Sequence, residues 1–359
     1  MSARATVIIP TYGEAYFAKW AVKSVQQQTV RDIEICIICD GSPLNMVEFF
    51  REMANEDSRI RVYSYPKSPR AGEPYRDEVI RRTTGRIICY CCHDDLWLPN
   101  YVETVETALQ SCSFTHSLQA IINVPEKIVD EDSVFSFVQL VDLENQEEIK
   151  RMLTEVYGFG LTFGAHTRDI YNQLEEGWVT TPIAGLATDL YMWRKVVSLK
   201  DVKLKTIPKI LALNLQKPAR LDWPQEERYA ELENYFSKLA DQHFLRFLEE
   251  YPAGYFGRKM KAFEINLRNI ENCIQDWTDL ANDWSNVANE RLADILSKQR
   301  QIDALNLELA ESREKTNQLI QQASLKRQII LFIKRTLPRP VSKWLVKIKR
   351  RLFGPKGIE

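Results

Sequence analysis

Apolar residues cluster in four short runs within the first hundred positions, and polar or mixed segments separate these runs. Each run has the length of a β-strand. The runs cover residues 6–10, 33–39, 61–65 and 86–92. The second reads Ile-Glu-Ile-Cys-Ile-Ile-Cys, a nearly continuous apolar sequence that is typical of a strand covered on both faces.

Between the first two runs the spacing changes from that of a strand to that of a helix. Over residues 15–27, apolar and small residues recur three or four positions apart, as Phe17, Trp20, Ala21, Ser24 and Val25 show. The strand-helix-strand order predicts an α/β domain with a Rossmann-like, largely parallel sheet. Because ligands bind at the carboxyl ends of the strands in such sheets, the residues that end the strands are the first candidates for chemistry.

Farther along the chain the pattern becomes helical. Residues 225–250 have helical spacing and many aromatic side chains, and residues 259–322 contain neither proline nor glycine, which predicts a long helical stretch. Apolar residues between 295 and 319 approximate the a and d positions of a heptad repeat, which Lys298 and Ser312 interrupt. This stretch is therefore either a coiled coil, through which the chain would form a homo-oligomer, or a helical hairpin that packs on the N-terminal domain.

The last part of the chain is strongly basic. Residues 326–359 contain eleven Lys or Arg and one acidic residue, whereas the whole chain has a net charge of −1. A helix over this part would place Val341, Trp344, Leu345 and Ile348 on one apolar face. Such a basic amphipathic tail suits an anionic membrane surface, although it could also pack on the protein body.

These patterns divide the chain into an α/β domain and an α-helical, partly coiled-coil C-terminal region. Its composition, 45% hydrophobic and 27% charged, is that of a folded protein, and its near-zero net charge gives no reason to expect a nucleic-acid partner. No signal peptide pattern and no span of about 20 apolar residues occur, so we expect a cytoplasmic protein. The α/β domain, a helical extension, the long helix or coiled coil and the basic tail cover residues 1–220, 221–257, 258–323 and 324–359.

The predicted strand ends carry a recognisable set of residues. The first strand ends in Ile-Ile-Pro-Thr-Tyr (8–12), the second in Cys-Asp-Gly-Ser (39–42) and the fourth in Cys-His-Asp-Asp-Leu-Trp-Leu-Pro (92–99). In order and spacing these motifs resemble glycosyltransferase family 2 on the GT-A fold, and this resemblance implies a Rossmann-like mixed sheet. The resemblance runs from residue 6 to about residue 215. It implies a nucleotide-sugar donor, whose diphosphate must be neutralised as it leaves.

Asp94 and Asp95 are the predicted site of that neutralisation. Carboxylates can hold a phosphate indirectly, through a divalent cation that bridges carboxylate and phosphate oxygens, and the resemblance implies Mg or Mn. The alternative is a solvated pair that caps the next helix. In the first C-x-x-C, Cys36 and Cys39 could instead bind zinc, although cysteine is also a common small core residue.

The resemblance assigns further donor contacts and a catalytic base. Thr11 and Tyr12 would line the base pocket, Asp40 would bind the base or ribose, and Arg76 would contact the donor phosphates. Asp40 could instead be a turn residue, and Arg76 a surface arginine. Asp189 is the candidate base for the acceptor hydroxyl, or else a helix N-cap.

Four features depart from the family pattern. Cys39 and Cys92 stand where many members have aspartate, Thr188 replaces a glutamate before Asp189, and the strand-like segment 207–215 lacks the histidine that often follows it. We therefore expect an inverting glycosyltransferase that acts on a saccharide or lipid-linked acceptor in surface polysaccharide synthesis, peripheral to the membrane. A catalytically degenerate coiled-coil scaffold and a nucleotidyltransferase remain as alternatives.

Overall fold

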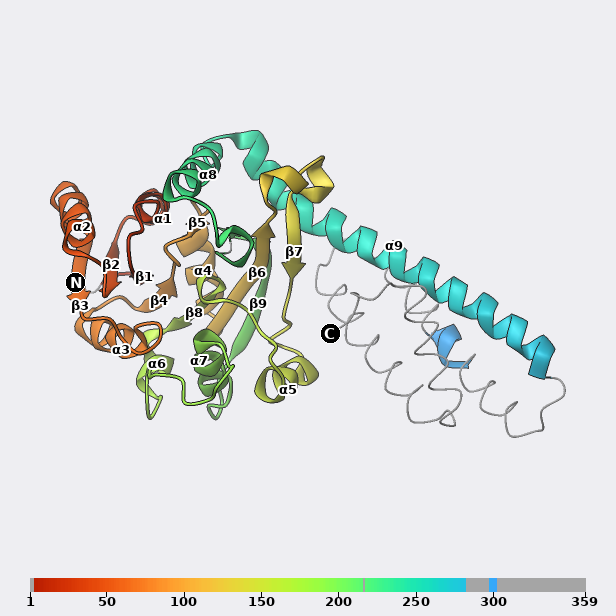
Figure 1. The fold of residues 1–359 in the computed structure, drawn as a ribbon. Helices are drawn as coiled ribbons and strands as arrows, with labels where there is room; N and C mark the ends of the chain where they lie inside the picture. The colour runs from red at the N-terminus through yellow and green to blue at the C-terminus, as the bar shows by residue number, and fades with distance from the viewer. Residues whose placement is uncertain (1–2, 216, 282–296, 302–359) are drawn as a thin grey trace. The chain divides into compact units, whose positions relative to one another are not determined.

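The computed structural model describes residues 3–215, 217–281 and 297–301 (Figure 1). The chain divides into two compact units, Met1–Pro252 and Ala253–Glu359. The sheet and every candidate site residue lie in the first unit.

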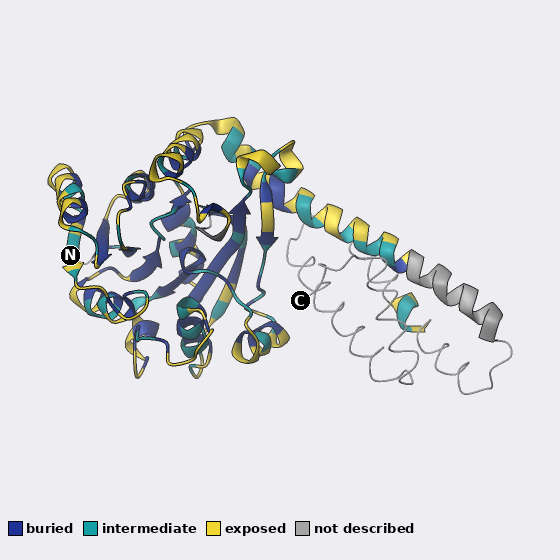
Figure 2. Ribbon diagram, viewed as in Figure 1, coloured by how far each residue is buried: buried dark blue, intermediate teal, exposed yellow. Residues whose placement is uncertain are grey.

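The four predicted strands form a parallel half-sheet. They are β1 (Ala5–Thr11), β2 (Ile33–Asp40), β3 (Ile60–Tyr65) and β4 (Ile87–Tyr90). Strand β1 lies between β2 and β4, and β3 pairs with the outer edge of β2. Every residue of β2 is buried, as its apolar run predicted (Figure 2).

The second half of the sheet is mixed and centres on β6 (Phe114–Ile122), which pairs with four strands. Its partners are β8 (Gly164–Thr167) and β7 (Phe135–Gln139), both antiparallel, and β9 (Leu204–Ile210) and β10 (Ala212–Asn214), both parallel.

The sheet is curled, as the position of β5 (Asp95–Trp97) shows. The strand order is β3-β2-β1-β4-β8-β6-β10-β5, so β4 and β5 are separated by three strands of the sheet. Only residues 91–94 connect them along the chain. A connection of this length reaches roughly 3.5 Å per residue, so the far end of the sheet must bend back toward β4. This bend brings the residues after β10 to the end of β4.

Helices pack around the sheet, and a helical region follows it. Those before residue 200 are α1 (Ala18–Gln26), α2 (Leu44–Glu56), α3 (Glu73–Arg82), α4 (Tyr101–Leu109), α5 (Gln146–Thr154), α6 (Arg168–Asn172) and α7 (Thr188–Val197). Helices α8 (Gln225–Lys238) and α9 (Gln242–Ala281) come after β10. The predicted heptad positions, Ile295 and those from Ile302 onward, and the tail at 324–359 lie outside the described residues. Within the described part of the chain, no helix is both long and apolar enough to cross a lipid bilayer.

Cys36 and Cys39 are core residues of β2. Both side chains are buried, and burial raises the pKa of the Cys36 thiol to about 12 and that of Cys39 to about 11. Among the described residues, the group arranged to hold a metal ion contains neither of them. The zinc alternative therefore has no support in the structure.

Candidate active site

A cavity of about 260 Å³ opens where the strand ends converge. Three segments that are distant in sequence line it. The first follows β1 and contributes Tyr12, and the second follows β4 and contributes His93 and Asp94. The third follows β10 and contributes Arg220 and Arg228, among others. This is the place where an α/β sheet of this kind binds ligands.

Tyr12 forms one wall of the cavity. Its ring is 41% exposed and meets the His93 ring edge-on, with 5.2 Å between the ring centroids. The imidazole of His93 is itself held by the backbone, because its Nδ1 lies 3.2 Å from the Pro10 carbonyl oxygen. An exposed aromatic face in a polar cavity is suited to packing on a planar base.

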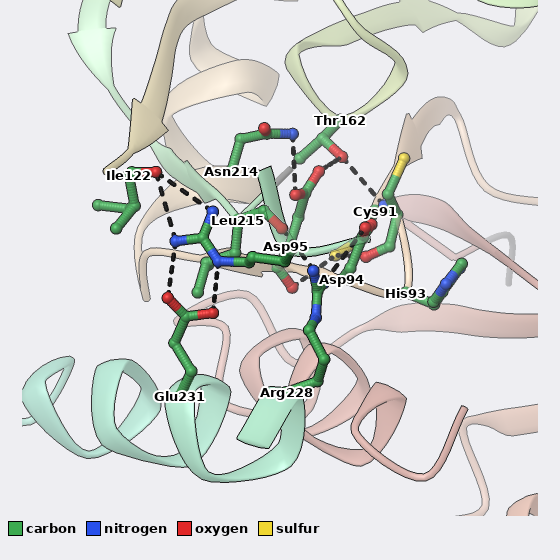
Figure 3. Close-up of polar contacts among 12 residues, drawn as sticks. Cys91, His93, Asp94, Asp95, Ile122, Thr162, Asn214, Leu215, Arg228 and Glu231 are labelled. Atoms are coloured by element: carbon green, nitrogen blue, oxygen red, sulfur yellow. Dashed lines mark hydrogen bonds and ion pairs between the residues drawn. The ribbon is translucent and has the colours of Figure 1, made fainter. Parts of the chain in front are cut away.

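The two acidic residues of the predicted metal site lie in different environments (Figure 3). Asp95 is fully buried. Asn214 Nδ2 donates a hydrogen bond of 2.9 Å to its Oδ1, and the Thr162 hydroxyl donates to its Oδ2. Burial, together with the neighbouring Asp94 carboxylate, raises the pKa of Asp95 well above its usual range. Asp94 is half-buried and lines the cavity, with its Oδ2 3.5 Å from an Arg228 nitrogen.

These side chains can accommodate a divalent cation. One ligand atom from each of Cys92, Asp94 and Asp95 lies within 4.8 Å of the others. Burial and the two carboxylates raise the pKa of the Cys92 thiol well above its usual range. Mg²⁺ and Mn²⁺ prefer carboxylate oxygens. The donor set therefore suits them through the aspartates, with Asp94 toward the cavity and Asp95 beneath it.

Thr11 and Asp40 lie at the ends of β1 and β2, as predicted, but they differ in their surroundings. The buried Thr11 hydroxyl has no hydrogen-bond partner in the described part of the chain. In contrast, both oxygens of the buried Asp40 accept hydrogen bonds from the protein. Lys67 Nζ lies 2.6 Å from Oδ2, and the Ser68 backbone nitrogen lies 2.5 Å from Oδ1. Asp40 thus fixes the loop before α3, a role that its sequence position did not reveal.

Arg76 is deeply buried in α3 rather than on the surface. The side chain is 3% exposed, and it donates one hydrogen bond of 2.7 Å to the Ala71 carbonyl. Its guanidinium lies 4.8 Å from the centroid of the Trp178 ring, while no residue that the structure describes pairs with Nε or Nη1. Desolvation lowers its pKa, and Cys92 and Asp189 are among the groups that act against this shift. The surface alternative is therefore excluded.

Asp189 lies in the first turn of α7 and is half-buried. Its Oδ1 accepts a hydrogen bond of 2.8 Å from the Leu190 backbone nitrogen. Burial raises the pKa of this carboxyl, although the Arg76 charge favours the ionised form. A carboxylate with a raised pKa beside a buried cation has the properties of a general base.

Sequence reasoning missed Glu73, a fully buried carboxylate that faces the start of α7. It accepts a hydrogen bond of 2.8 Å from the Thr188 hydroxyl, at the position where the family pattern has a glutamate. Burial works to raise the pKa of Glu73, but hydrogen bonds from the backbone and from Thr188 outweigh it and lower the pKa. Nothing in a linear reading of α3 pairs these two residues.

Comparisons with known proteins agree with this arrangement. Residues 6–136 match the family described as glycosyl transferase family 2. The chain is 33% identical over 98 residues to an uncharacterized glycosyltransferase of Rickettsia conorii, a match that covers 27% of this chain and 16% of that protein. It is 25% identical over 120 residues to WfgD of Escherichia coli, a UDP-Glc:alpha-D-GlcNAc-diphosphoundecaprenol beta-1,3-glucosyltransferase, covering 33% of this chain and 46% of that one. Each match thus spans less than half of the relative's length.

Solved structures with a similar arrangement are distant in sequence. One is the mannosyltransferase PcManGT from Pyrobaculum calidifontis in complex with GDP-Man and Mn²⁺. It has a TM-score of 0.41 and 14% identity, and the superposition covers 90% of this chain and 87% of that one. The match over residues 6–136 confirms, for that segment, the family predicted from the strand-end motifs, and the curled mixed sheet confirms the predicted fold class.

Proposed function

We propose that this chain, which carries a family 2 glycosyltransferase domain on the GT-A fold, transfers a sugar from a nucleotide donor to a saccharide or lipid-linked acceptor. One observation carries the proposal: a single cavity brings together an exposed aromatic ring and an accessible carboxylate of a cation site. Tyr12 supplies the ring and Asp94 the carboxylate. The E. coli relative, whose name gives a nucleotide-sugar donor and a diphosphoundecaprenol-linked acceptor, supports this substrate class and a part in surface polysaccharide synthesis.

The proposed reaction is a single displacement that inverts the anomeric carbon. The acceptor oxygen forms a bond to that carbon, the bond to the donor diphosphate breaks with its electron pair, and the nucleoside diphosphate leaves. Asp189 accepts the proton of the acceptor hydroxyl. Asp94 and Asp95 would hold Mg²⁺ or Mn²⁺, which supplies charge neutralisation for the leaving diphosphate. Thr11 and Tyr12 would contact the base, and the unpartnered nitrogens of Arg76 would donate to donor oxygens.

The direct test is a thermal-shift panel of nucleotides and nucleotide sugars, with and without Mn²⁺. A ligand that binds only the native state raises the melting temperature, by an amount that grows with its concentration relative to Kd. We expect one nucleoside diphosphate and its sugar conjugate to stabilise the full chain, and Mn²⁺ to increase the shift. If no nucleotide produces a shift under either condition, the degenerate-scaffold alternative would replace this proposal.

The basic tail at 324–359 is proposed to attach the enzyme to an anionic membrane surface. Lipid attraction contributes about 1 kcal/mol for each basic residue near the surface, so binding should be measurable and sensitive to salt. The full chain should co-sediment with anionic vesicles but not with neutral ones, and a chain truncated after Ser324 should stay in the supernatant. The variant Trp344→Glu should weaken sedimentation at any ionic strength, and Lys347→Glu mainly at low salt. Equal sedimentation of the full and truncated chains would refute membrane attachment by the tail.

A further inference from the structure

Helix α8 places a buried and incompletely paired arginine at the cavity. Arg228 is 4% exposed, yet it lines the cavity beside Asp94 (Figure 3). One terminal nitrogen, Nη2, lies 3.2 Å from the Leu215 carbonyl oxygen and 3.5 Å from the Asp94 carboxylate. Its Nε and Nη1 have no hydrogen-bond partner among the described residues.

This arrangement is costly for a folded protein. A buried guanidinium normally has its donors satisfied, because leaving a buried polar group unpaired is unfavourable. Desolvation lowers the pKa of Arg228. The guanidinium lies 5.2 Å from the centroid of the Phe17 ring, and this ring supplies no hydrogen-bond acceptor. Nε and Nη1 of Arg228 therefore still need an acceptor, and the described part of the protein does not provide one.

Arg220 lines the same cavity, but its donors are paired with acceptors of the protein. Its Nε and Nη2 each lie 2.6 Å from the Glu231 carboxylate, and Nη2 also donates to the Asn123 carbonyl at 3.0 Å. Arg220 thus anchors α8 to the end of β6. With Arg220 fixed in this way, Arg228 is the one of these two arginines that keeps unpaired donors for a ligand.

The partner that fits is an anion with several oxygens. The unpartnered Nε and Nη1 lie on different edges of the guanidinium plane, so no single pair of oxygens satisfies both, whereas the several oxygens of a diphosphate can accept from both edges. A diphosphate would also meet the cation that Asp94 is proposed to hold, so the Arg228 charge and that cation would neutralise it from two sides. A single carboxylate would pair with one edge of the guanidinium and would make no use of the neighbouring cation site.

We propose that Arg228 binds the diphosphate of the donor and stabilises the negative charge that develops on it as it leaves. This inference rests on the proposed transferase function and adds a phosphate-binding residue from α8, outside the matched segment 6–136.

The test compares nucleosides with their diphosphates by isothermal titration calorimetry on the full chain. The probes are matched pairs (uridine and UDP, guanosine and GDP, and the cytidine, thymidine and adenosine pairs), each with Mn²⁺ and with EDTA. For the preferred base, Arg228→Met should weaken diphosphate binding by about 10- to 100-fold, because charge-assisted hydrogen bonds are lost. It should leave nucleoside binding unchanged. Lys238→Met, which removes an exposed positive charge from the same helix, is the matched control and should change neither.

Each outcome separates this inference from the proposed function. If the wild-type chain binds no nucleotide, the transferase proposal fails. The inference also has two ways to fail when the wild-type chain does bind a nucleotide. Arg228 is structural if Arg228→Met keeps the full preference for diphosphate over nucleoside, or if it weakens the binding of both probes equally. Should Arg228→Met not fold, Arg228→Lys keeps the charge but loses the planar set of separate donors that the guanidinium offers. That variant should reduce the preference several-fold with little change in melting temperature, and an unreduced preference would overturn the inference.

Discussion

Replacing Asp189 with asparagine should lower turnover by about 10²- to 10⁴-fold, the usual contribution of a general base. Asparagine keeps the size of the side chain, and its carbonyl oxygen can still accept the hydrogen bond from Leu190. It cannot accept a proton from the acceptor hydroxyl. Donor affinity and melting temperature should therefore remain close to those of the wild-type chain.

The measurement is steady-state transfer at saturating donor, with donor affinity determined separately by calorimetry. Asp169→Asn is the matched control, because Asp169 is an exposed aspartate in the first turn of α6, as Asp189 is in the first turn of α7. Normal turnover at saturation combined with weak donor binding in Asp189→Asn would place Asp189 in the donor site instead.

The pH dependence of turnover follows from the same carboxyl group. Burial raises the pKa of Asp189 above its ordinary value near 4. Below this raised pKa the carboxyl is protonated and cannot act as a base, so turnover should fall on the acidic side at a higher pH than an exposed aspartate would give. That acidic limb should be absent from the residual activity of Asp189→Asn, whereas in Asp169→Asn it should match the wild-type profile.

The parallel half of the sheet could be predicted because its strands are short and nearly continuous in apolar residues. Strand β2, buried along its whole length, is the clearest example. The same pattern located the strand ends, and with them Tyr12 and the Asp94–Asp95 pair. Periodicity alone did not predict the strands of the mixed half of the sheet. The burial of each segment there depends on how it pairs with β6.

The surroundings of the site residues could not be predicted, because they come from distant parts of the chain. Asn214 reaches Asp95 because β10 pairs with β5, and Thr162 reaches it because it lies just before β8, the neighbour of β4. Arg228 reaches the cavity from a helix that the sequence places in a separate extension. Thr188 reaches a carboxylate of α3 across more than a hundred residues of sequence. Such contacts depend on the packed fold and leave no local pattern in the sequence.

Alanine substitutions of Asp94 and Asp95 should have different dominant effects, although both should abolish transfer. Asp94 lines the cavity and offers its carboxylate to the cation, so Asp94→Ala should remove the Mn²⁺-dependent part of nucleotide binding. Loss of this charge stabilisation should lower turnover at least 10²- to 10³-fold, roughly the effect of removing one group that stabilises transition-state charge. EDTA should produce the same loss in the wild-type chain.

Asp95→Ala should act first on the fold. It removes the buried acceptor of both the Thr162 hydroxyl and the Asn214 amide, and each donor left unsatisfied costs about 1–3 kcal/mol. Thermal unfolding of the two variants, measured beside Mn²⁺ titrations in the presence of the preferred nucleoside diphosphate, separates the two roles. The melting temperature should fall more in Asp95→Ala than in Asp94→Ala. If Asp94→Ala kept the full Mn²⁺ response, the cation would not be held at the Asp94 carboxylate. Asp95 would not explain such a result by itself, because it lies beneath Asp94 and its oxygens already accept hydrogen bonds from the protein.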